Sequence, residues 1–450
     1  MKEHLMTLIE SRRFGELARI LKEENAVDIA LLLDEVDDGV LPYIYRILPK
    51  ELAAETFVEM EPEPQAALIR AFSDRELREM LDELFLDDTV DIIEEMPAGV
   101  VKRILQNSDP ATRRSINEIL QYPEDSAGTI MTIEYVDLKR DMTVAQAFDR
   151  IRRTGYDKET IYDCYVTDSG RRLLGMVTVH TLLLADQDCI IGDIMETNII
   201  HVHTNDDQED VARQFEKYDF RAIAVLDNEE RLVGIVTFDD AMDVITEEAT
   251  EDMEIMSAIT PSEKTYLRSG AMELFKNRFP WLLLLMLSAT FTGMIITSFE
   301  SALASQVILT AFIPMLMGTG GNTGSQSSVT IIRALSLEEV DFSDIFRVIW
   351  KEVRVAVLCG VALALACFAK LQLVDRLLLG NPDVTLAVSA VVCATMVLLV
   401  LFAKVTGCIL PMLAKKLHLD PAVMASPFIT TIVDTVSLLI YFGIAKLVLF

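Results

Sequence analysis

The sequence predicts a multidomain protein with three parts: an α-helical superhelical N domain, an α/β region built by tandem duplication, and an all-α transmembrane domain of five helices. Three observations lead to this prediction. Helix-breaking residues recur at a short, fixed spacing near the N-terminus. A block of sequence is repeated in the middle of the chain. The remainder consists mainly of long uncharged apolar runs, which are typical of membrane spans.

The N domain is expected to cover residues 1–128. Apolar residues follow helical spacing there, as in residues 26–33. Helix-breaking or capping residues occur at positions 48–49, 72–74 and 96–97, which are 24 residues apart each time. A repeat of this length predicts helix pairs stacked into a superhelix.

The middle of the chain contains the duplication. Residues 165–178 align with residues 224–237 at an offset of 59 without a gap, and each copy indicates strand, turn and strand before a helix. Helical patterns at residues 144–148 and 211–215 precede these blocks at an offset of 67, so we expect the first intervening loop to be eight residues longer. The arrangement resembles a tandem pair of CBS (cystathionine β-synthase) domains, which often sense ligands. These two domains are placed at residues 129–192 and 193–253.

The last part, residues 276–450, is expected to cross the membrane five times. A hydrocarbon core about 30 Å thick requires about 20 apolar residues per helix. The runs that meet or approach this length are residues 280–299, 301–332, 355–369, 384–403 and 421–445. Basic residues gather before the first run, between the second and third, and between the fourth and fifth. The positive-inside rule then places the N-terminus in the cytosol and the C-terminus outside a cell (inner) membrane.

The charge of the chain is divided unevenly. The total is 40 Lys+Arg against 70 Asp+Glu, and residues 273–450 hold 12 and 11 of these, which leaves 28 and 59 for residues 1–272. Because a phosphate backbone attracts basic residues, no nucleic-acid partner is expected; an acidic soluble part favours cations instead. The N-terminus has no apolar signal segment, so we expect the acidic part to be cytosolic.

The sequence offers no pattern typical of an enzyme. The five histidines are scattered, and no Ser/His/Asp, Cys/His or metal-hydrolase arrangement is present. The six cysteines include no Cys-x-x-Cys pair, and we expect them to be core residues rather than zinc ligands or disulfide partners.

A glycine-rich segment, residues 314–326, lies inside the second apolar run. Irregular backbone at membrane depth is tolerated only inside protein or along a water-filled cavity, so carbonyl groups freed there could face a cation. Close packing of helices through glycine is the plainer interpretation. A phosphate-binding loop is disfavoured because no lysine follows the glycines.

Asp434 lies inside the last apolar run, where a carboxylate costs at least about 2.5–3.5 kcal/mol. A cation pathway is the natural explanation, and a structural pair with Lys404 at the end of the fourth run is the alternative. Lys404 near a cation path would oppose flow, so we expect it to point elsewhere or to snorkel. The hydroxyl groups nearby in the sequence belong to Thr430, Thr431, Thr435 and Ser437.

A second set of carboxylates follows the duplicated block. Several of them would share one face of a helix at spacings of three and four residues, which destabilises a helix by a few tenths of a kcal/mol per pair. A bound divalent cation would remove this penalty, since hard cations take oxygen ligands; a solvated acidic face is the alternative. The set comprises Asp239, Asp240, Asp243, Glu247, Glu248, Glu251, Asp252 and Glu254.

Three motifs together resemble one family, the MgtE-type magnesium channels. Residues 314–327 with 331–335 resemble the family signature, residues 420–434 look like its last span, and residues 122–132 look like its entry to the CBS pair. The similarity covers essentially the full chain in the same domain order. It implies a Mg²⁺-selective channel in the lipid bilayer, built as a homodimer with the pore on its axis.

The resemblance also implies residue roles. Asp434 would hold a hydrated Mg²⁺ in the pore, backbone around Gly320, Gly321 and Asn322 would help line the path, and a connecting "plug" helix over about residues 254–275 would gate the inner mouth. The implied ligands of regulatory Mg²⁺ are Asp87, Asp91, Glu209, Asp219, Asp240, Asp243, Glu248, Glu251 and Asp252.

The expected function is therefore Mg²⁺ uptake that closes when cytosolic Mg²⁺ bridges the acidic surfaces. Two alternatives stay open: a channel for Mn²⁺ or Co²⁺, and a membrane-anchored Mg²⁺ or nucleotide sensor without transport, which would not need Asp434. Some family members bind ATP in the CBS pair. The second unit has the motif as Gly234, Thr237 and Asp240, but the first has Thr181 in place of the Asp, so ATP binding there is doubtful, and Asp240 is assigned to Mg²⁺.

Overall fold

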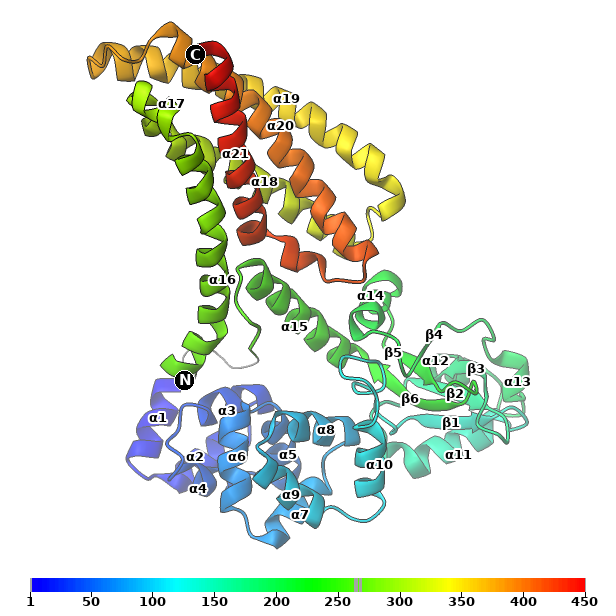
Figure 1. Cartoon of the computed structure of the whole chain (residues 1–450). Coiled ribbons are helices and arrows are strands. Elements are labelled where there is room, and N and C mark those ends of the chain that lie inside the picture. The colour runs from blue at the N-terminus through cyan, green and yellow to red at the C-terminus, as the bar shows by residue number, and fades with distance from the viewer. Residues whose placement is uncertain (1, 263–265, 267–268, 450) are drawn as a thin grey trace. The chain divides into compact units, whose positions relative to one another are not determined.

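The computed structural model describes residues 2–262, 266 and 269–449 (Figure 1). The chain folds as two compact units, Met1–Thr246 and Glu247–Phe450. The first holds the acidic part of the sequence, and the second holds the apolar runs.

The first unit begins with ten short helices, drawn in blue to cyan in Figure 1. α3, α5, α7 and α9 begin at residues 26, 50, 74 and 98, so the predicted period of 24 residues is confirmed. Helices of this length are marginal in isolation, so burial of their apolar faces must stabilise them. The helices are α1 (Lys2–Glu10), α2 (Phe14–Leu21), α3 (Ala26–Leu33), α4 (Leu41–Tyr45), α5 (Lys50–Val58), α6 (Pro62–Ala71), α7 (Asp74–Leu81), α8 (Leu86–Glu95), α9 (Ala98–Asn107) and α10 (Thr112–Ile119).

Two copies of one α/β motif follow. In the first, β1 (Val136–Lys139) leads to α11 (Val144–Thr154), η1 (Gly155–Asp157), β2 (Asp163–Thr167) and β3 (Leu173–Thr178), then α12 (Val179–Leu184) and α13 (Ile191–Ile194). In the second, β4 (His201–His203) leads to α14 (Gln208–Tyr218), β5 (Ala222–Leu226), β6 (Leu232–Thr237) and α15 (Phe238–Met256). The first strand of each sheet is parallel to the second, and the second is antiparallel to the third.

The offset of 59 holds for the strand pairs, but the offset of 67 for the helices was wrong. The side-chain caps Thr143 and Asp207 place α11 and α14 64 residues apart. Eight residues, 155–162, separate α11 from β2, and three, 219–221, separate α14 from β5, so the first loop is five residues longer rather than eight. The error came from the helical pattern itself, because apolar residues recur every three or four positions and a three-residue slip still matches.

One apolar core runs through the ten N-terminal helices and into the second sheet. It includes Phe57, Val90 and Ile104 from the helices and Val225 and Val236 from β5 and β6. The helical part and the second α/β copy therefore pack as one body, which fixes how their surface carboxylates face one another.

The second unit consists mainly of long helices, drawn from green to red in Figure 1. Within the described residues, four helical segments are long and apolar enough to cross a membrane: Ala271–Ser298, Phe342–Leu378, Leu386–Lys416 and Pro421–Leu449. A further helix of 24 residues, α18, is rich in Gly, Ser and Thr. The elements are α16 (Ala271–Ser298), α17 (Glu300–Ser305), η2 (Val307–Phe312), α18 (Ile313–Ser336), η3 (Phe342–Asp344), α19 (Ile345–Ala369), η4 (Lys370–Leu378), α20 (Leu386–Lys416), η5 (Pro421–Met424) and α21 (Ser426–Leu449).

The expected connecting helix over about residues 254–275 is not found as one helix. α15 continues from the second α/β copy to Met256, residues 257–262 and 269–270 are not helical, and α16 begins at Ala271. Residues 263–265 and 267–268 of the expected helix lie outside the described residues. Pro261 explains part of this, because proline removes a backbone donor and disfavours helix in the residue before it.

Candidate functional site

Glycines of α18 bring this helix directly against α21. A Cβ atom at Gly320 would lie 2.9 Å from Val433 Cγ1 and 3.1 Å from Ser437 Oγ, and one at Gly321 would lie 3.0 Å from Thr430 Cγ2. Distances this short leave no room for a side chain. The glycines therefore set the close approach of the two helices, as small residues do in membrane helix pairs.

Asp434 lies on the α21 face that meets Gly321. Its Oδ1 is 3.9 Å from the position that a Cβ at Gly321 would occupy, and its side chain is half-buried. The hydroxyls of Thr430 and Thr431 both donate to the Pro427 carbonyl oxygen, at 2.9 and 3.1 Å, and Thr435 donates to the Thr431 carbonyl oxygen at 2.9 Å. These hydroxyls therefore do not solvate Asp434 as donors, and within the described residues its carboxylate has no hydrogen-bond or ion-pair partner.

The expectation of irregular backbone in the glycine-rich segment was wrong. α18 is continuous from Ile313 to Ser336, and its glycines serve the helix packing that was the plainer interpretation. Asn322 follows Gly321 by about 100° around the helix, and its side chain is exposed rather than directed at α21. The structure thus places Gly320 and Gly321 beside Asp434 but does not place Asn322 there.

Lys404 pairs with Glu352, so the proposed alternative of a pair with Asp434 was wrong. Lys404 Nζ on α20 lies 3.5 Å from Glu352 Oε2 on α19 and donates to Ser327 Oγ of α18 at 3.2 Å. Ser327 Oγ donates to the same Glu352 oxygen at 2.6 Å. The lysine and glutamate side chains are 8 % and 12 % exposed, so both charges are largely removed from solvent and compensate each other.

A cluster of carboxylates forms the second candidate site, within the first unit. Asp87 on α8 is 5 % exposed, and its charge is repelled by that of Asp240 on α15. Of the nine regulatory ligands that the resemblance implies, four, namely Asp87, Asp91, Asp240 and Asp243, lie in one region of the structure. The members are Glu59, Asp87, Asp88, Asp91, Glu159, Asp239, Asp240 and Asp243.

Burial and mutual repulsion both disfavour the charged forms of Asp87, Asp88 and Glu159. Burial, followed by repulsion from Asp240, raises the pKa of Asp88 to about 7 and that of Asp91 to about 8. Burial and the neighbouring Asp88 raise the pKa of Glu159 to about 8. Burial raises the pKa of Asp87 well above its ordinary value. Asp91 lies at the solvent-accessible edge of the cluster, so water screens its repulsion more than that of Asp87.

Sequence reasoning missed three members of this cluster, namely Glu59, Asp88 and Glu159, whereas Asp239 belonged to the acidic set noted after the duplicated block. Glu159 lies in the longer loop between α11 and β2, so the unequal loop lengths of the two copies were the available signal. Asp88 adjoins Asp87 at the start of α8, where acidic residues are also favoured by the helix dipole. An acidic residue at this position needs no metal site to explain it, so nothing in the sequence assigned Asp88 to the cluster.

The remaining expected ligands lie elsewhere. Glu209 at the start of α14 is paired with Arg213, and Asp219 caps the end of that helix in the left-handed region. A rise of 1.5 Å per residue separates them by about 15 Å, so they cannot share one ion within a chain. Glu248, Glu251 and Asp252 lie on the last turns of α15, in the second unit.

The helix starts that follow β3 and β6 differ at one position. In the second copy, Thr237 Oγ1 donates to Asp240 Oδ2 at 2.6 Å. In the first copy, Thr181 takes the place of the aspartate, and its Oγ1 lies 3.0 Å from Thr178 Oγ1. The first copy therefore has no carboxylate to bind a ribose, while that of the second belongs to the carboxylate cluster.

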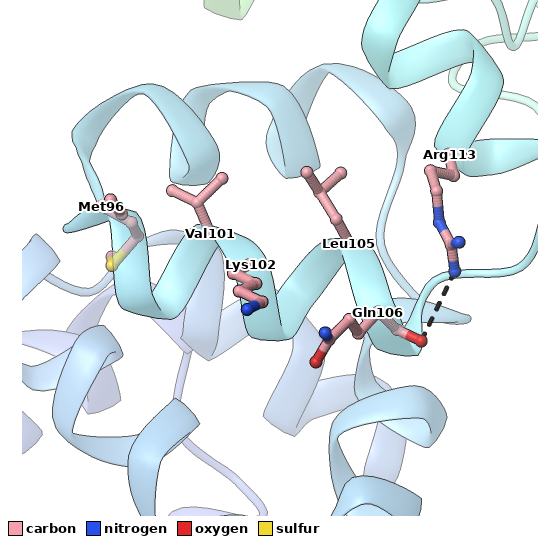
Figure 2. Close-up of a pocket in the computed structure, with 7 residues that line it drawn as sticks. Met96, Val101, Lys102, Leu105, Gln106 and Arg113 are labelled. Carbon is pink, nitrogen blue, oxygen red and sulfur yellow. Dashed lines mark hydrogen bonds between the residues drawn. The ribbon is translucent and has the colours of Figure 1, made fainter.

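A shallow pocket of about 520 Å³ lies along α9 (Figure 2). Arg113 donates to the Gln106 carbonyl oxygen at 3.4 Å across its end. Its lining has two basic side chains and no carboxylate, so it does not suit a cation. The lining residues are Met96, Ala98, Val101, Lys102, Leu105, Gln106 and Arg113.

Comparison with known proteins identifies the family. Residues 313–444 match the MgtE model, described as a divalent cation transporter, residues 24–125 match the MgtE intracellular N domain, and residues 127–188 and 191–247 match the CBS domain. A magnesium transporter MgtE of Thermus thermophilus is 38% identical, and the match covers 100% of this chain and 99% of the relative. The chain belongs to the MgtE family.

Other MgtE relatives agree. The magnesium transporter MgtE of Bacillus subtilis is 32% identical over 98% of this chain and 96% of its own. The crystal structure of the cytosolic domain of the Mg²⁺ channel MgtE in complex with ATP is 37% identical, with a TM-score of 0.51, and the match covers 54% of this chain and 100% of that one. The soluble part of a magnesium transporter matches with the same TM-score at 29% identity, covering 55% of this chain and 98% of its own.

Substitution of Gly407 tests the helix packing of the MgtE membrane unit. A Cβ there would collide with the backbone carbonyl oxygen of Gly324, which cannot rotate away. We expect Gly407→Ala to lower unfolding free energy in detergent by about 1–3 kcal/mol, the usual cost of overpacking. Gly318→Ala is the matched control, because nothing lies within 4 Å of its Cβ position. Equal melting temperatures for the two variants would contradict the packing argument.

The carboxylate cluster predicts an unusual pH dependence for the metal-free protein. Its raised pKa values mean that the folded unit binds protons more tightly than the unfolded chain. The stability that these groups contribute is therefore fully present below about pH 4 and is lost as pH rises through about 6–8. Carboxylates with lowered pKa values, such as Glu76 at about 2, stabilise the fold at higher pH, and their contribution is lost only as pH falls below this window. We expect the melting temperature in a chelator to fall between pH 5 and 8, and excess Mg²⁺ to flatten the slope. A melting temperature that rises over this interval would contradict the interpretation.

Proposed function

We propose that this protein carries Mg²⁺ across a membrane and that cytosolic Mg²⁺, bound at the carboxylate cluster, closes the path. The observation that carries the transport part is Asp434, a half-buried carboxylate beside Gly321 without a described hydrogen-bond or ion-pair partner. The names of the full-length relatives support the choice of ion.

The chemistry around Asp434 favours a hard, hydrated cation. Mg²⁺ dehydrates reluctantly and is held through few carboxylates and its own water. The side chains beside Asp434 along the α18–α21 contact are threonines, serine, valine and glycine, with no soft ligand among those described. A single carboxylate with accepting hydroxyl oxygens suits an ion that keeps most of its water.

Transport through this site requires a second copy of the chain. One chain supplies one Asp434. Its helix α16 contacts α21, and the rest of the apolar surface of α16 is not buried within the chain. We propose a homodimer in the cell (inner) membrane, with the pore on its axis. Asn322 and the exposed side of α18 would then face the partner or the path. The N-terminus and CBS domains would be cytosolic, and the C-terminus would lie outside.

Gating follows from the repulsion within the carboxylate cluster. The compact arrangement holds Asp87, Asp88 and Asp240 together at an electrostatic cost, and a divalent cation binding there stabilises that arrangement over an opened one. The shift equals the difference in Mg²⁺ affinity between the two arrangements. Glu209, Asp219, Glu248, Glu251 and Asp252 would supply further Mg²⁺ sites on surfaces that join α14 and α15 to other parts of the dimer.

We propose no ATP site in either copy. The first copy lacks the ribose-binding carboxylate, and Asp240 of the second is held by Thr237 within the cluster. The ATP binding of the related cytosolic domain is therefore not carried over to this chain.

Neutralising Asp434 tests the transport proposal. In proteoliposomes we expect Asp434→Asn to reduce Mg²⁺ uptake about a hundredfold, since removing one partner of a buried charge pair costs about 2–5 kcal/mol. Asp383→Asn, an exposed loop carboxylate, is the control and should transport normally. Uptake of Mn²⁺ or Co²⁺ but not Mg²⁺ would assign another ion. If well-folded protein shows no flux under any condition, the result would favour a membrane-anchored sensor without transport.

Variants of the cluster test gating separately. We expect Asp88→Asn/Asp91→Asn to raise the cytosolic Mg²⁺ concentration that halves the flux by about fivefold or more, which corresponds to about 1 kcal/mol of coupling. The exposed Asp149 of α11 provides the control variant, Asp149→Asn. The measurement is current or uptake as a function of cytosolic Mg²⁺. An unchanged concentration dependence with normal flux would remove the cluster from gating and leave the transport proposal standing.

A further inference from the structure

Two histidines and a glutamate converge on the second α/β copy, apart from the carboxylate cluster. His201 and His203 alternate along β4, so both side chains lie on one face of the sheet. Glu230 lies in the turn between β5 and β6. One ligand atom from each of the three residues lies within 4.8 Å of the others, and His203 Nε2 is already 3.6 Å from Glu230 Oε1.

The second ring nitrogen of each histidine lies near an oxygen atom, and that of His201 is hydrogen-bonded. His201 Nδ1 lies 3.2 Å from the Ile199 carbonyl oxygen, so it donates there and leaves Nε2 available. His203 Nδ1 lies 3.9 Å from Asp206 Oδ2, and that carboxylate is fixed because it accepts from the His203 backbone N–H at 2.7 Å. Histidines that bind metal ions usually present one nitrogen to the ion and the other to a carbonyl or carboxylate oxygen.

The turn that carries Glu230 is rigid. Asp227 Oδ1 accepts from the backbone N–H groups of Glu229 and Arg231, at 2.8 and 2.9 Å. Arg231 is paired with Glu229, which leaves the Glu230 carboxylate directed to His203. The glutamate is thus held near the histidines by the backbone of the turn.

The first copy shows what the same scaffold looks like without these ligands. Asp137 and Lys139 on β1 take the positions of His201 and His203, because their partners on β2 and β5 are 59 residues apart. Arg171 takes the position of Glu230 in a turn of the same geometry. There Asp137 is neutralised by Lys139 and Arg150, so the strand–turn scaffold needs no metal-ligand set.

We propose that His201, His203 and Glu230 bind a transition-metal dication of the Zn²⁺ class, with Asp206 orienting His203. Imidazole nitrogen favours Zn²⁺, Co²⁺ and Ni²⁺ over Mg²⁺, which prefers oxygen alone. Zinc ligands at about 2.0–2.1 Å lie roughly 3.3 Å apart, so small side-chain rotations close the site. A solvent molecule would complete the tetrahedral shell. The bound ion would join β4 to the β5–β6 turn.

The test uses the full-length protein in detergent, without a polyhistidine tag and with millimolar Mg²⁺ to occupy carboxylate sites. Zn²⁺ binding is measured by calorimetry, and Co²⁺ ligation by its visible absorption. We expect one saturable site per chain. Binding should weaken at least about tenfold in His203→Gln and in Glu230→Gln, and about tenfold in Asp206→Asn. His180→Gln, an exposed histidine of the first copy, should bind as the parent protein does.

Two results would overturn the proposal. One is the absence of saturable Zn²⁺ binding above the Mg²⁺ background, and the other is binding that His203→Gln and Glu230→Gln leave unchanged. Glu230 lies exposed in a turn, so its variant should fold even where a strand substitution does not. Mg²⁺ uptake measured in parallel should be unaffected in these variants, so failure of this site is distinguishable from failure of the transport proposal.

Discussion

The shared apolar core of the first unit is the constraint on which its chemistry depends. Burial of residues such as Phe57, Val90 and Val236 in one core holds the N-terminal helices against the second α/β copy. Each buried apolar side chain contributes on the order of 1.5–3 kcal/mol. This packing forces α8 and the start of α15 together, and their carboxylates with them. The repulsion is tolerated because the apolar core contributes more stabilisation than the repulsion removes, and a cation bound there as proposed would relieve the repulsion.

In the membrane unit the corresponding constraint is the narrow gap between α18 and its neighbours. Side chains at Gly321 or Gly407 would displace atoms of α21 or the backbone of α18 itself. The absence of side chains lets Asp434 lie at a helix–helix contact rather than in lipid. The buried Lys404–Glu352 pair, bridged by Ser327, joins α18, α19 and α20 at a different contact. The buried lysine is thus compensated by a carboxylate, whereas Asp434 has no hydrogen-bond or ion-pair partner among the described residues.

Much of the fold followed from sequence because it rests on periodic or repeated patterns. The structure confirms both the 24-residue helix period and the 59-residue strand offset. The helix offset of 67 did not, because an apolar helix pattern matches itself after a one-turn slip, whereas the caps at Thr143 and Asp207 define the register.

The candidate sites were predicted less completely. Four of the nine implied ligands, Asp87, Asp91, Asp240 and Asp243, lie together, and Glu159 joins them from the longer loop of the first copy, although nothing in the sequence singled it out. The partner of Lys404 was also missed, because Glu352 lies 52 residues away and only the packing of α19 on α20 brings them together. A glycine-rich sequence is compatible with both a broken and a continuous helix. In the structure the helix is continuous, and its glycines pack against Val433 and Thr430 of α21.

The duplication allows one chain to carry its own internal comparison. Positions where the copies agree, such as Asp168 and Asp227 in the turns, maintain the shared backbone. Positions where they differ, such as Thr181 and Asp240, carry different side chains on the same backbone. A substitution at a shared turn position would therefore disturb the folding of its copy, whereas a substitution at a differing position would change the chemistry of that copy and keep its backbone.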